Sequence, residues 1–242
     1  QGKTSMALNI AQFVGVSAGL PVGIFSLEMS QEELVDRLLV GQADIDAWKL
    51  KTGRLDEKDF DKLSLAMGEL AEAPIFIDDT PGISISEIRT KARRLQVEHG
   101  LKFLIVDYLQ LIHGRNLENR VQEVSEISQQ LKNLARELKI PVLAISQLNR
   151  SVEARGTRKP QLADLRESGA IEQDADVVMF IFVEDLENPE NITLDIQKHR
   201  NGPTGEIKLF FRRDRTKFYG SEKARGVKPV EKPEGKEAAA AV

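Results

Sequence analysis

Three residues near the start of the chain have the types and order of a phosphate-binding loop. Gly2, Lys3 and Thr4 match the last three positions of the pattern G-x-x-x-x-G-K-[ST], and Ser5 follows them. In such a loop, backbone N–H groups and a helix start surround the phosphates, the lysine reaches the β- and γ-oxygens, and the hydroxyl binds Mg²⁺. The front of the pattern and the strand before it do not appear in the sequence, so we expect the chain as written to bind ATP poorly.

A carboxylate ends an apolar segment further along the chain. Asp107 follows the continuous apolar run Phe103–Val106, which is typical of a strand covered on both faces of a parallel sheet. Ligands of α/β folds bind at the carboxyl ends of such strands, where a P-loop enzyme places its Mg²⁺-organising acid. Alone, Asp107 is also consistent with a helix-capping acid. Together with Lys3 and Thr4, it predicts a joint phosphate and metal site.

Two further polar residues follow strand-like segments. Glu28 comes after Val22–Ser26, and Gln147 comes after Val142–Ser146. Because burying an acid costs free energy unless it is used or paired, Glu28 suits a carboxylate that activates water, with an ordinary loop acid as the alternative. Gln147 suits a nucleotide sensor, although polar residues at strand ends are common. The lysine, hydroxyl, two carboxylates and amide are the groups needed for metal-assisted attack of water on a γ-phosphate, so they predict an NTPase.

Two cations precede a turn late in the chain. Lys198 and Arg200 lie just before Asn201–Gly205, which contains glycine and proline. One interpretation is a solvated hairpin tip. The other is an arginine finger offered to a neighbouring subunit's nucleotide, which supplies positive charge to the transition state. The second interpretation implies an oligomer.

The segment Asp164–Ala170 is polar, mixed in charge and contains Gly169. It has no aromatic residue on which a base could stack, and its composition alone predicts a flexible loop. Backbone N–H groups near Gly169 can hold a phosphate whatever the base sequence, so DNA contact stays open as an alternative.

Strands and helices alternate through most of the chain, which indicates an α/β fold with a mostly parallel sheet flanked by helices. The last strands have no helices between them and predict an antiparallel edge. The expected strands cover 22–26, 74–78, 103–107, 142–146, 177–183, 192–197 and 206–211. The expected helices cover about 6–14, 30–40, 45–51, 57–72, 84–99 and 121–138, with Ser30/Glu33 and Ser84/Glu87 as capping boxes.

Composition limits the class of protein. The 242 residues have 41% hydrophobic and 30% charged residues, which suits one domain over 1–222 and a disordered tail over 223–242. Without cysteine and with three scattered histidines, disulfides and a structural zinc site are not expected. No apolar run is long enough to span a membrane and no signal peptide is evident, so we expect a cytoplasmic enzyme. A net charge of −4 does not indicate a nucleic-acid binder, but bulk charge says little about a narrow DNA channel.

Six phrases in this order resemble the bacterial replicative DNA helicases of the DnaB type, and they span residues 2 to about 215. They are Gly2–Thr4 with Ala7–Ala11, Phe25–Ser30, Leu104–Leu111, Ser146–Arg150, Asp164–Asp176 and Lys198–Gly205.

The resemblance implies a RecA-like P-loop motor that forms a homo-hexameric ring around single-stranded DNA, with ATP and Mg²⁺ between subunits. It implies 5'–3' translocation, duplex unwinding, and a primase and a helicase loader as partners. Each predicted site residue receives a role. Lys3 and Thr4 bind phosphate and Mg²⁺ with Gly2 and Ser5, Arg37 binds nucleotide, Glu28 activates water, Asp107 organises the metal, Gln147 links nucleotide to DNA, Lys198 and Arg200 reach the neighbour's site, and Arg166, Glu167 and Gly169 hold the DNA backbone.

Three other classes of protein remain alternatives. A RecA- or KaiC-like ATPase has the same fold, but the phrases at 164–176 and 198–205 argue against it. A small-molecule P-loop kinase needs a lid and an acceptor pocket. A non-catalytic scaffold does not need Lys3, Thr4, Glu28 and Asp107 together.

Overall fold

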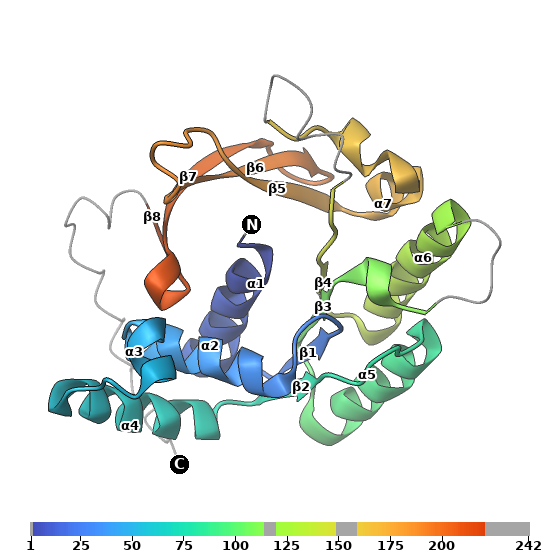
Figure 1. Cartoon of the computed structure of the whole chain (residues 1–242). Coiled ribbons are helices and arrows are strands. Elements are labelled where there is room, and N and C mark those ends of the chain that lie inside the picture. The colour runs from blue at the N-terminus through green and yellow to red at the C-terminus, as the bar shows by residue number, and fades with distance from the viewer. Residues whose placement is uncertain (1, 114–119, 149–158, 221–242) are drawn as a thin grey trace, which may run out of the picture.

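The computed structural model describes residues 2–113, 120–148 and 159–220 and contains two four-stranded sheets. The parallel sheet has the order β2-β1-β3-β4, and the antiparallel sheet has the order β5-β6-β7-β8. The antiparallel strands arch over helix α1 (Lys3–Gln12), whereas the parallel sheet lies on its other side (Figure 1). The predicted α/β class with a mostly parallel sheet is therefore confirmed. The antiparallel strands pair with one another and not, within the described residues, with the parallel sheet.

The two central strands of the parallel sheet are buried on both faces, as their continuous apolar sequences predict, and the two outer strands are less buried. Its strands are β1 (Val22–Ser26), β2 (Ile75–Asp78), β3 (Phe103–Asp107) and β4 (Val142–Ala144). Successive side chains point to opposite faces. Phe25, Leu104 and Val106 join one hydrophobic cluster, while Ile24 and Ile105 join another. β4 is two residues shorter than expected.

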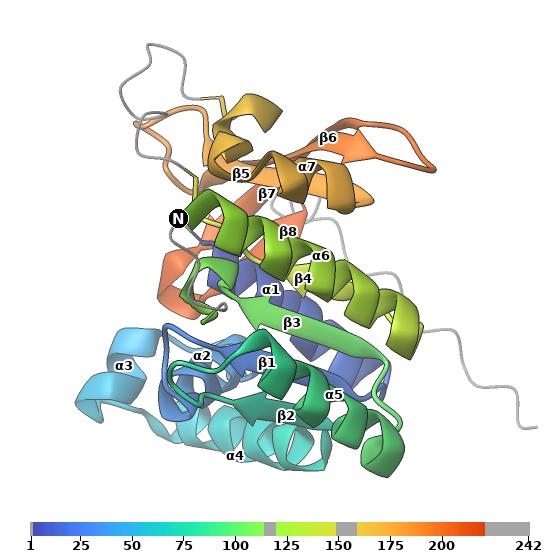
Figure 2. The same ribbon diagram turned by 90° about the vertical axis from the view of Figure 1, so that its right-hand side faces the viewer.

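Helices cover both faces of this sheet. α5 (Ile85–His99) and α6 (Arg120–Leu138) pack on the Phe25 side, where Figure 2 shows them in front of the strands. α1 and α2 (Gln31–Ala43) pack on the Ile24 side. α3 (Ala47–Thr52) and α4 (Glu57–Glu72) follow α2 and add a small cluster of their own.

Local signals located several helix starts correctly. Ser30 with Glu33 and Ser84 with Glu87 form the two predicted capping boxes. The first helix begins earlier than expected, at Lys3, and a π-helical turn, η1 (Phe13–Ser17), continues it. Phe13 falls within the helix expected over 6–14 but is 67% exposed, because the buried face of α1 is formed by Ala7, Leu8 and Ala11.

The antiparallel sheet consists of β5 (Val177–Val183), β6 (Asn191–His199), β7 (Gly205–Arg212) and β8 (Lys217–Gly220). β8 was not predicted, since four residues after a short 3₁₀ turn, η5 (Arg213–Arg215), give too little periodicity. β8 pairs with β7 and contacts α1, so it joins this sheet to the first helix.

The expectation of a flexible loop at 164–170 was wrong. These residues form a 3₁₀ helix, η4 (Leu162–Ser168), followed by α7 (Gly169–Asp174). Leu165 is 7% exposed and packs with Val178 and Phe180, contacts that composition alone does not reveal. The expected tail over 223–242 and the residues Asn149 and Arg150 lie outside the described residues.

Candidate nucleotide-binding site

The first turn of α1 presents the predicted phosphate-binding residues. Gly2 precedes the helix with a φ of 83°, a left-handed conformation that favours glycine. A Cβ at Gly2 would also lie 3.3 Å from the Phe218 ring. Lys3, Thr4 and Ser5 are the first helical residues. Because N–H groups in the first turn lack partners within the helix and the helix dipole is positive there, this end of α1 can receive an anion.

Asp107 meets this helix start from the end of β3. The Thr4 hydroxyl donates a hydrogen bond of 2.5 Å to Asp107 Oδ2 across 103 positions of sequence. Asp107 is only 4% exposed. Burial raises the pKa of its carboxyl above the ordinary value, and the charge of Glu28 raises it further, against the opposing effects of Thr4, Lys3 and Arg37. An isolated buried carboxylate is costly, so a cation at this point would be favoured.

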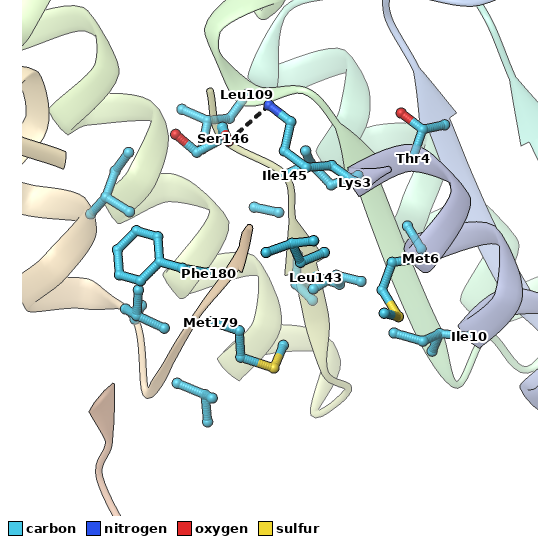
Figure 3. Close-up of a pocket in the computed structure, with 18 of the residues that line it drawn as sticks. Lys3, Thr4, Met6, Ile10, Leu109, Leu143, Ile145, Ser146, Met179 and Phe180 are labelled. Atoms are coloured by element: carbon cyan, nitrogen blue, oxygen red, sulfur yellow. Dashed lines mark hydrogen bonds between the residues drawn. The ribbon is translucent and has the colours of Figure 1, made fainter. Parts of the chain in front are cut away.

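Lys3 lies between the two carboxylates and the end of β4. Its Nζ donates to the Ser146 carbonyl at 3.2 Å (Figure 3). Burial lowers the pKa of the Lys3 ammonium, whereas the negative charges of Asp107 and Glu28 oppose that shift. Among the described residues, Lys3 thus lies in a cluster of mixed charge but has no close ion pair. Its ammonium can therefore give up its hydrogen bond to the Ser146 carbonyl and bind a phosphate instead.

A short turn after β1 holds Glu28. The Ser26 hydroxyl donates to the Met29 carbonyl at 2.6 Å and closes the turn, while Leu27 N–H donates to the Asp107 carbonyl at 2.7 Å. Glu28 therefore leaves the backbone next to the end of β3. Sequence reasoning gave no role to Ser26, whose only signal was its place at a strand end.

Arg37 lies one helical stretch further on, in α2, and lines the same cavity as Glu28 and Lys3. Its backbone carbonyl accepts a hydrogen bond from Thr216 at 3.1 Å, and Asn9 of α1 donates to the Thr216 carbonyl at 2.9 Å. The turn before β8 thereby fixes α2 relative to α1.

A cavity of about 1440 Å³ extends from these polar residues into the space between β4 and β5. Its polar end contains Gly2, Lys3, Thr4, Ser5, Glu28, Arg37 and Gln147. Its other end is apolar. Figure 3 shows Met6 and Ile10 of α1 facing Leu143, with Met179 and Phe180 on the opposite side. Within the described residues, β4 and β5 each pair with one neighbour only, so this apolar space separates two strand edges.

Gln147 lies just beyond β4, exposed, at the polar end of the cavity. Gln110, in the 3₁₀ turn η2 (Leu109–Leu111), holds its backbone: Gln147 N–H donates to Gln110 Oε1 at 3.3 Å. Gln110 lies in Leu104–Leu111, one of the six segments that carry the family resemblance, but the sequence predicted no role for it. Its position three residues after Asp107 was the available signal.

The structure does not bring Lys198 and Arg200 into this cluster. Lys198 Nζ donates to the Glu172 carbonyl at 2.5 Å, at the end of α7. An Arg200 Nη1 lies 2.9 Å from Asp176 Oδ1, and Asp176 also pairs with Lys132. Arg200 and Asp176 are 47% and 54% exposed in their side chains, so solvent reaches this pair.

The predicted DNA-contacting residues lie at the junction of η4 and α7. Arg166 and Glu167 are in η4, and their side chains lie outside what the structure describes. Gly169 is exposed and begins α7 with a φ of −50°, so its backbone N–H is at a helix start. Its conformation is one that any residue adopts.

Thr4 and Asp107 are suitable for a Mg²⁺ that arrives with phosphates. In the part of the chain that the structure describes, no group of three or more His, Asp or Glu side chains is placed to hold a metal. In phosphate sites Mg²⁺ needs only one or two protein ligands besides phosphate and water oxygens. The donor set fits this arrangement.

Comparison with known families decides the relationship. The model of the DnaB-like helicase C terminal domain matches residues 1–220. The chain belongs to this family. Among its DnaB-family relatives, the replicative DNA helicase DnaC of Bacillus subtilis (strain 168) is 52% identical over 229 residues, covering 92% of this chain and 50% of that protein. The replicative DNA helicase DnaB of Geobacillus stearothermophilus has the same identity and coverage.

Solved structures of related ATPases have the same fold. One, an isolated ATPase domain, superposes with a TM-score of 0.86 at 37% identity, covering 90% of this chain and 80% of that one. A DnaB-like replicative helicase, described with its interactions with primase, gives the same TM-score and identity over 90% of this chain and 54% of that one. The RecA-like ATPase fold expected from the resemblance is therefore confirmed.

The chain spans about half the length of the DnaB-family relatives that it matches. Within the described residues, no helix combines the length and apolar character needed to cross a membrane.

Proposed function

We propose that this chain is the ATP-hydrolysing motor of a replicative DNA helicase, which moves 5'–3' along single-stranded DNA and unwinds the duplex. The observation that carries the proposal is the hydrogen bond between Thr4 and Asp107, with Lys3 beside them. It joins a helix start suited to phosphates with a buried carboxylate suited to Mg²⁺. Membership of the DnaB-like family supports the helicase output.

The residues divide the chemistry among them. Bound Mg²⁺ would draw charge from the phosphate oxygens. Lys3 and the N–H groups of the first turn of α1 hold the phosphates, with Gly2 and Ser5 shaping the loop. Thr4 and Asp107 hold the metal, and Arg37 approaches the nucleotide from α2. Glu28 accepts a proton from the attacking water, and Gln147 senses the γ-phosphate.

The remaining predicted residues would act only in the assembled protein, between subunits or on DNA. Lys198 and Arg200 would complete the site of a neighbouring subunit in a homo-hexamer, since in their own chain they bind groups of α7 and Asp176 instead of the Lys3 and Thr4 cluster. Arg166, Glu167 and Gly169 would contact the DNA backbone, because a motor that travels must bind without reading sequence. A primase and a helicase loader as partners, and a place in the cytoplasm, complete the proposal.

Hydrolysis of ATP by the natural full-length protein, with and without oligo(dT), tests it. A rate that rises strongly with DNA, and cooperatively with protein concentration, is the expected result. Robust hydrolysis that is indifferent to DNA would instead support the alternative, a RecA- or KaiC-like ATPase with another output.

A further inference from the structure

The side-chain amide of Gln110 contacts the chain at the end of β4 through three hydrogen bonds. Gln110 Nε2 donates to Ser146 Oγ at 2.8 Å and to the Gln147 carbonyl at 3.2 Å. Gln110 Oε1 accepts from Gln147 N–H at 3.3 Å. Both backbone groups of Gln147 thus bind the Gln110 side chain, and the Gln147 carbonyl also accepts from Ser146 Oγ at 3.3 Å.

These contacts continue the β3–β4 ladder past the end of both strands. Ile145 N–H donates to the Val106 carbonyl at 2.9 Å, and Leu109 N–H donates to the Ile145 carbonyl at 3.0 Å. One step further, a glutamine amide offers one carbonyl and one NH₂ group, the same donor and acceptor as a peptide unit. Gln110 therefore takes the place of the next backbone partner for Gln147.

The same piece of chain receives Lys3. Lys3 Nζ donates to the Ser146 carbonyl, while Gln110 binds the Ser146 hydroxyl. When a phosphate replaces that carbonyl as the partner of Lys3, residue 146 loses one of its anchors, and Gln110 is the anchor that stays. The backbone of Gln147 then stays in place, and so does the origin of its exposed side chain.

We propose that Gln110 is a positioning residue that holds Gln147 at the nucleotide site through its backbone. The inference rests on the proposed function, because it assigns Gln110 an effect only through the sensor role of Gln147. A misplaced catalytic group lowers the rate of the chemical step more than ground-state binding.

The test compares Gln110→Met, Gln147→Ala and the double variant in the full-length protein, by ATP hydrolysis with and without oligo(dT). Gln110→Met keeps the length of the side chain but removes its donor and acceptor. We expect kcat with DNA to fall about 10-fold, with KM for ATP changed by less than about twofold and the stimulation by DNA reduced. The double variant is expected to match Gln147→Ala, because residues that act through one another are not additive.

Gln96→Met is the matched control, because Gln96 Nε2 also donates to a backbone carbonyl, that of Leu138, away from the cavity. It is expected to keep wild-type kcat and DNA stimulation.

The outcomes separate the two proposals. Wild-type kinetics for Gln110→Met, or effects that multiply in the double variant, would overturn the positioning role while the proposed function stands. Wild-type kinetics for Gln147→Ala would remove the sensor role itself, and the role of Gln110 with it.

Discussion

The carboxyl edge of the parallel sheet and the end of β6 are both expected to act on a phosphate, but the predicted residues of the two regions do not come together in one chain. At the sheet edge, Thr4 donates to the buried Asp107, and Lys3 donates to the Ser146 carbonyl just beyond β4. At the end of β6, Lys198 donates to the Glu172 carbonyl in a partly buried setting, and Arg200 pairs with Asp176 where solvent reaches both side chains. The side chains of the first region are fixed by the hydrophobic core beneath them. In the second region, the exposed ion pair of Arg200 contributes little stability, so Arg200 can leave it for another partner.

The largest effect is expected from the second region. Arg200→Ala should lower kcat in the assembled protein by about 10³-fold, because an arginine finger stabilises the charge of the transition state. The measurement is phosphate release by the variant alone and mixed with a Lys3→Ala variant. Recovery of activity in the mixture is expected if the finger acts in trans.

The exposed Arg94 on α5 provides the control, since Arg94→Ala should leave turnover unchanged. Absence of recovery at every mixing ratio would place Arg200 outside a shared site and remove the contrast between the two regions.

A somewhat smaller effect is expected in the first region. Glu28→Gln should lower kcat by about 10²–10³-fold, within the range of about 10²–10⁴-fold that a general base contributes, and leave ATP binding intact. Binding of a fluorescent ATP analogue, measured beside phosphate release, separates the two. Glu32→Gln, an exposed acid in the first turn of α2, serves as the control. Normal turnover in Glu28→Gln would remove Glu28 from catalysis.

The two regions also differ in how far the sequence predicts them. Asp107 could be placed at a strand end because an apolar run that ends in a carboxylate is a local pattern. The 3₁₀ helix η4 could not be predicted, because it depends on Leu165 packing against Val178 and Phe180, which are distant in sequence. The contacts of Gln110 could not be predicted for the same reason, as its partners at 146 and 147 follow another strand, β4.

A moderate change in the melting temperature is expected from the burial of Asp107. Because its pKa is raised in the folded state, the folded protein binds the proton more tightly than the unfolded chain, so ionisation destabilises the fold as the pH rises above 3.8. Asp107→Asn should therefore raise the Tm of the nucleotide-free protein at neutral pH by about 2–4 °C, and the difference should disappear below about pH 4. Differential scanning calorimetry across this pH range measures it.

Asp214→Asn provides a control of opposite sign. Its hydrogen bond with Arg212 lowers the pKa of Asp214, so its charge stabilises the folded state above the ordinary pKa, and the variant should have a lower Tm at neutral pH. If Asp107→Asn also had a lower Tm, the Asp107 carboxylate would stabilise the fold. The burial of this charge would then not reduce the stability of the protein.

The smallest effect is expected at Asp176. Its pair with Arg200 is about half exposed on both sides, and such pairs contribute roughly 0–1 kcal/mol. Arg200→Ala, which leaves the second ion pair of Asp176 with Lys132 in place, should therefore change the free energy of unfolding by less than about 1 kcal/mol in urea denaturation. Asp195→Asn, at a 5% exposed acid beside Lys159 in the same sheet, should cost more, because it alters a buried, hydrogen-bonded charge. An equal loss in the two variants would make Arg200 part of the scaffold. If the fold depended on Arg200 in its present position, Arg200 could not move to a neighbour's phosphate without destabilising its own sheet. The free-energy cost alone would then exclude a role in trans.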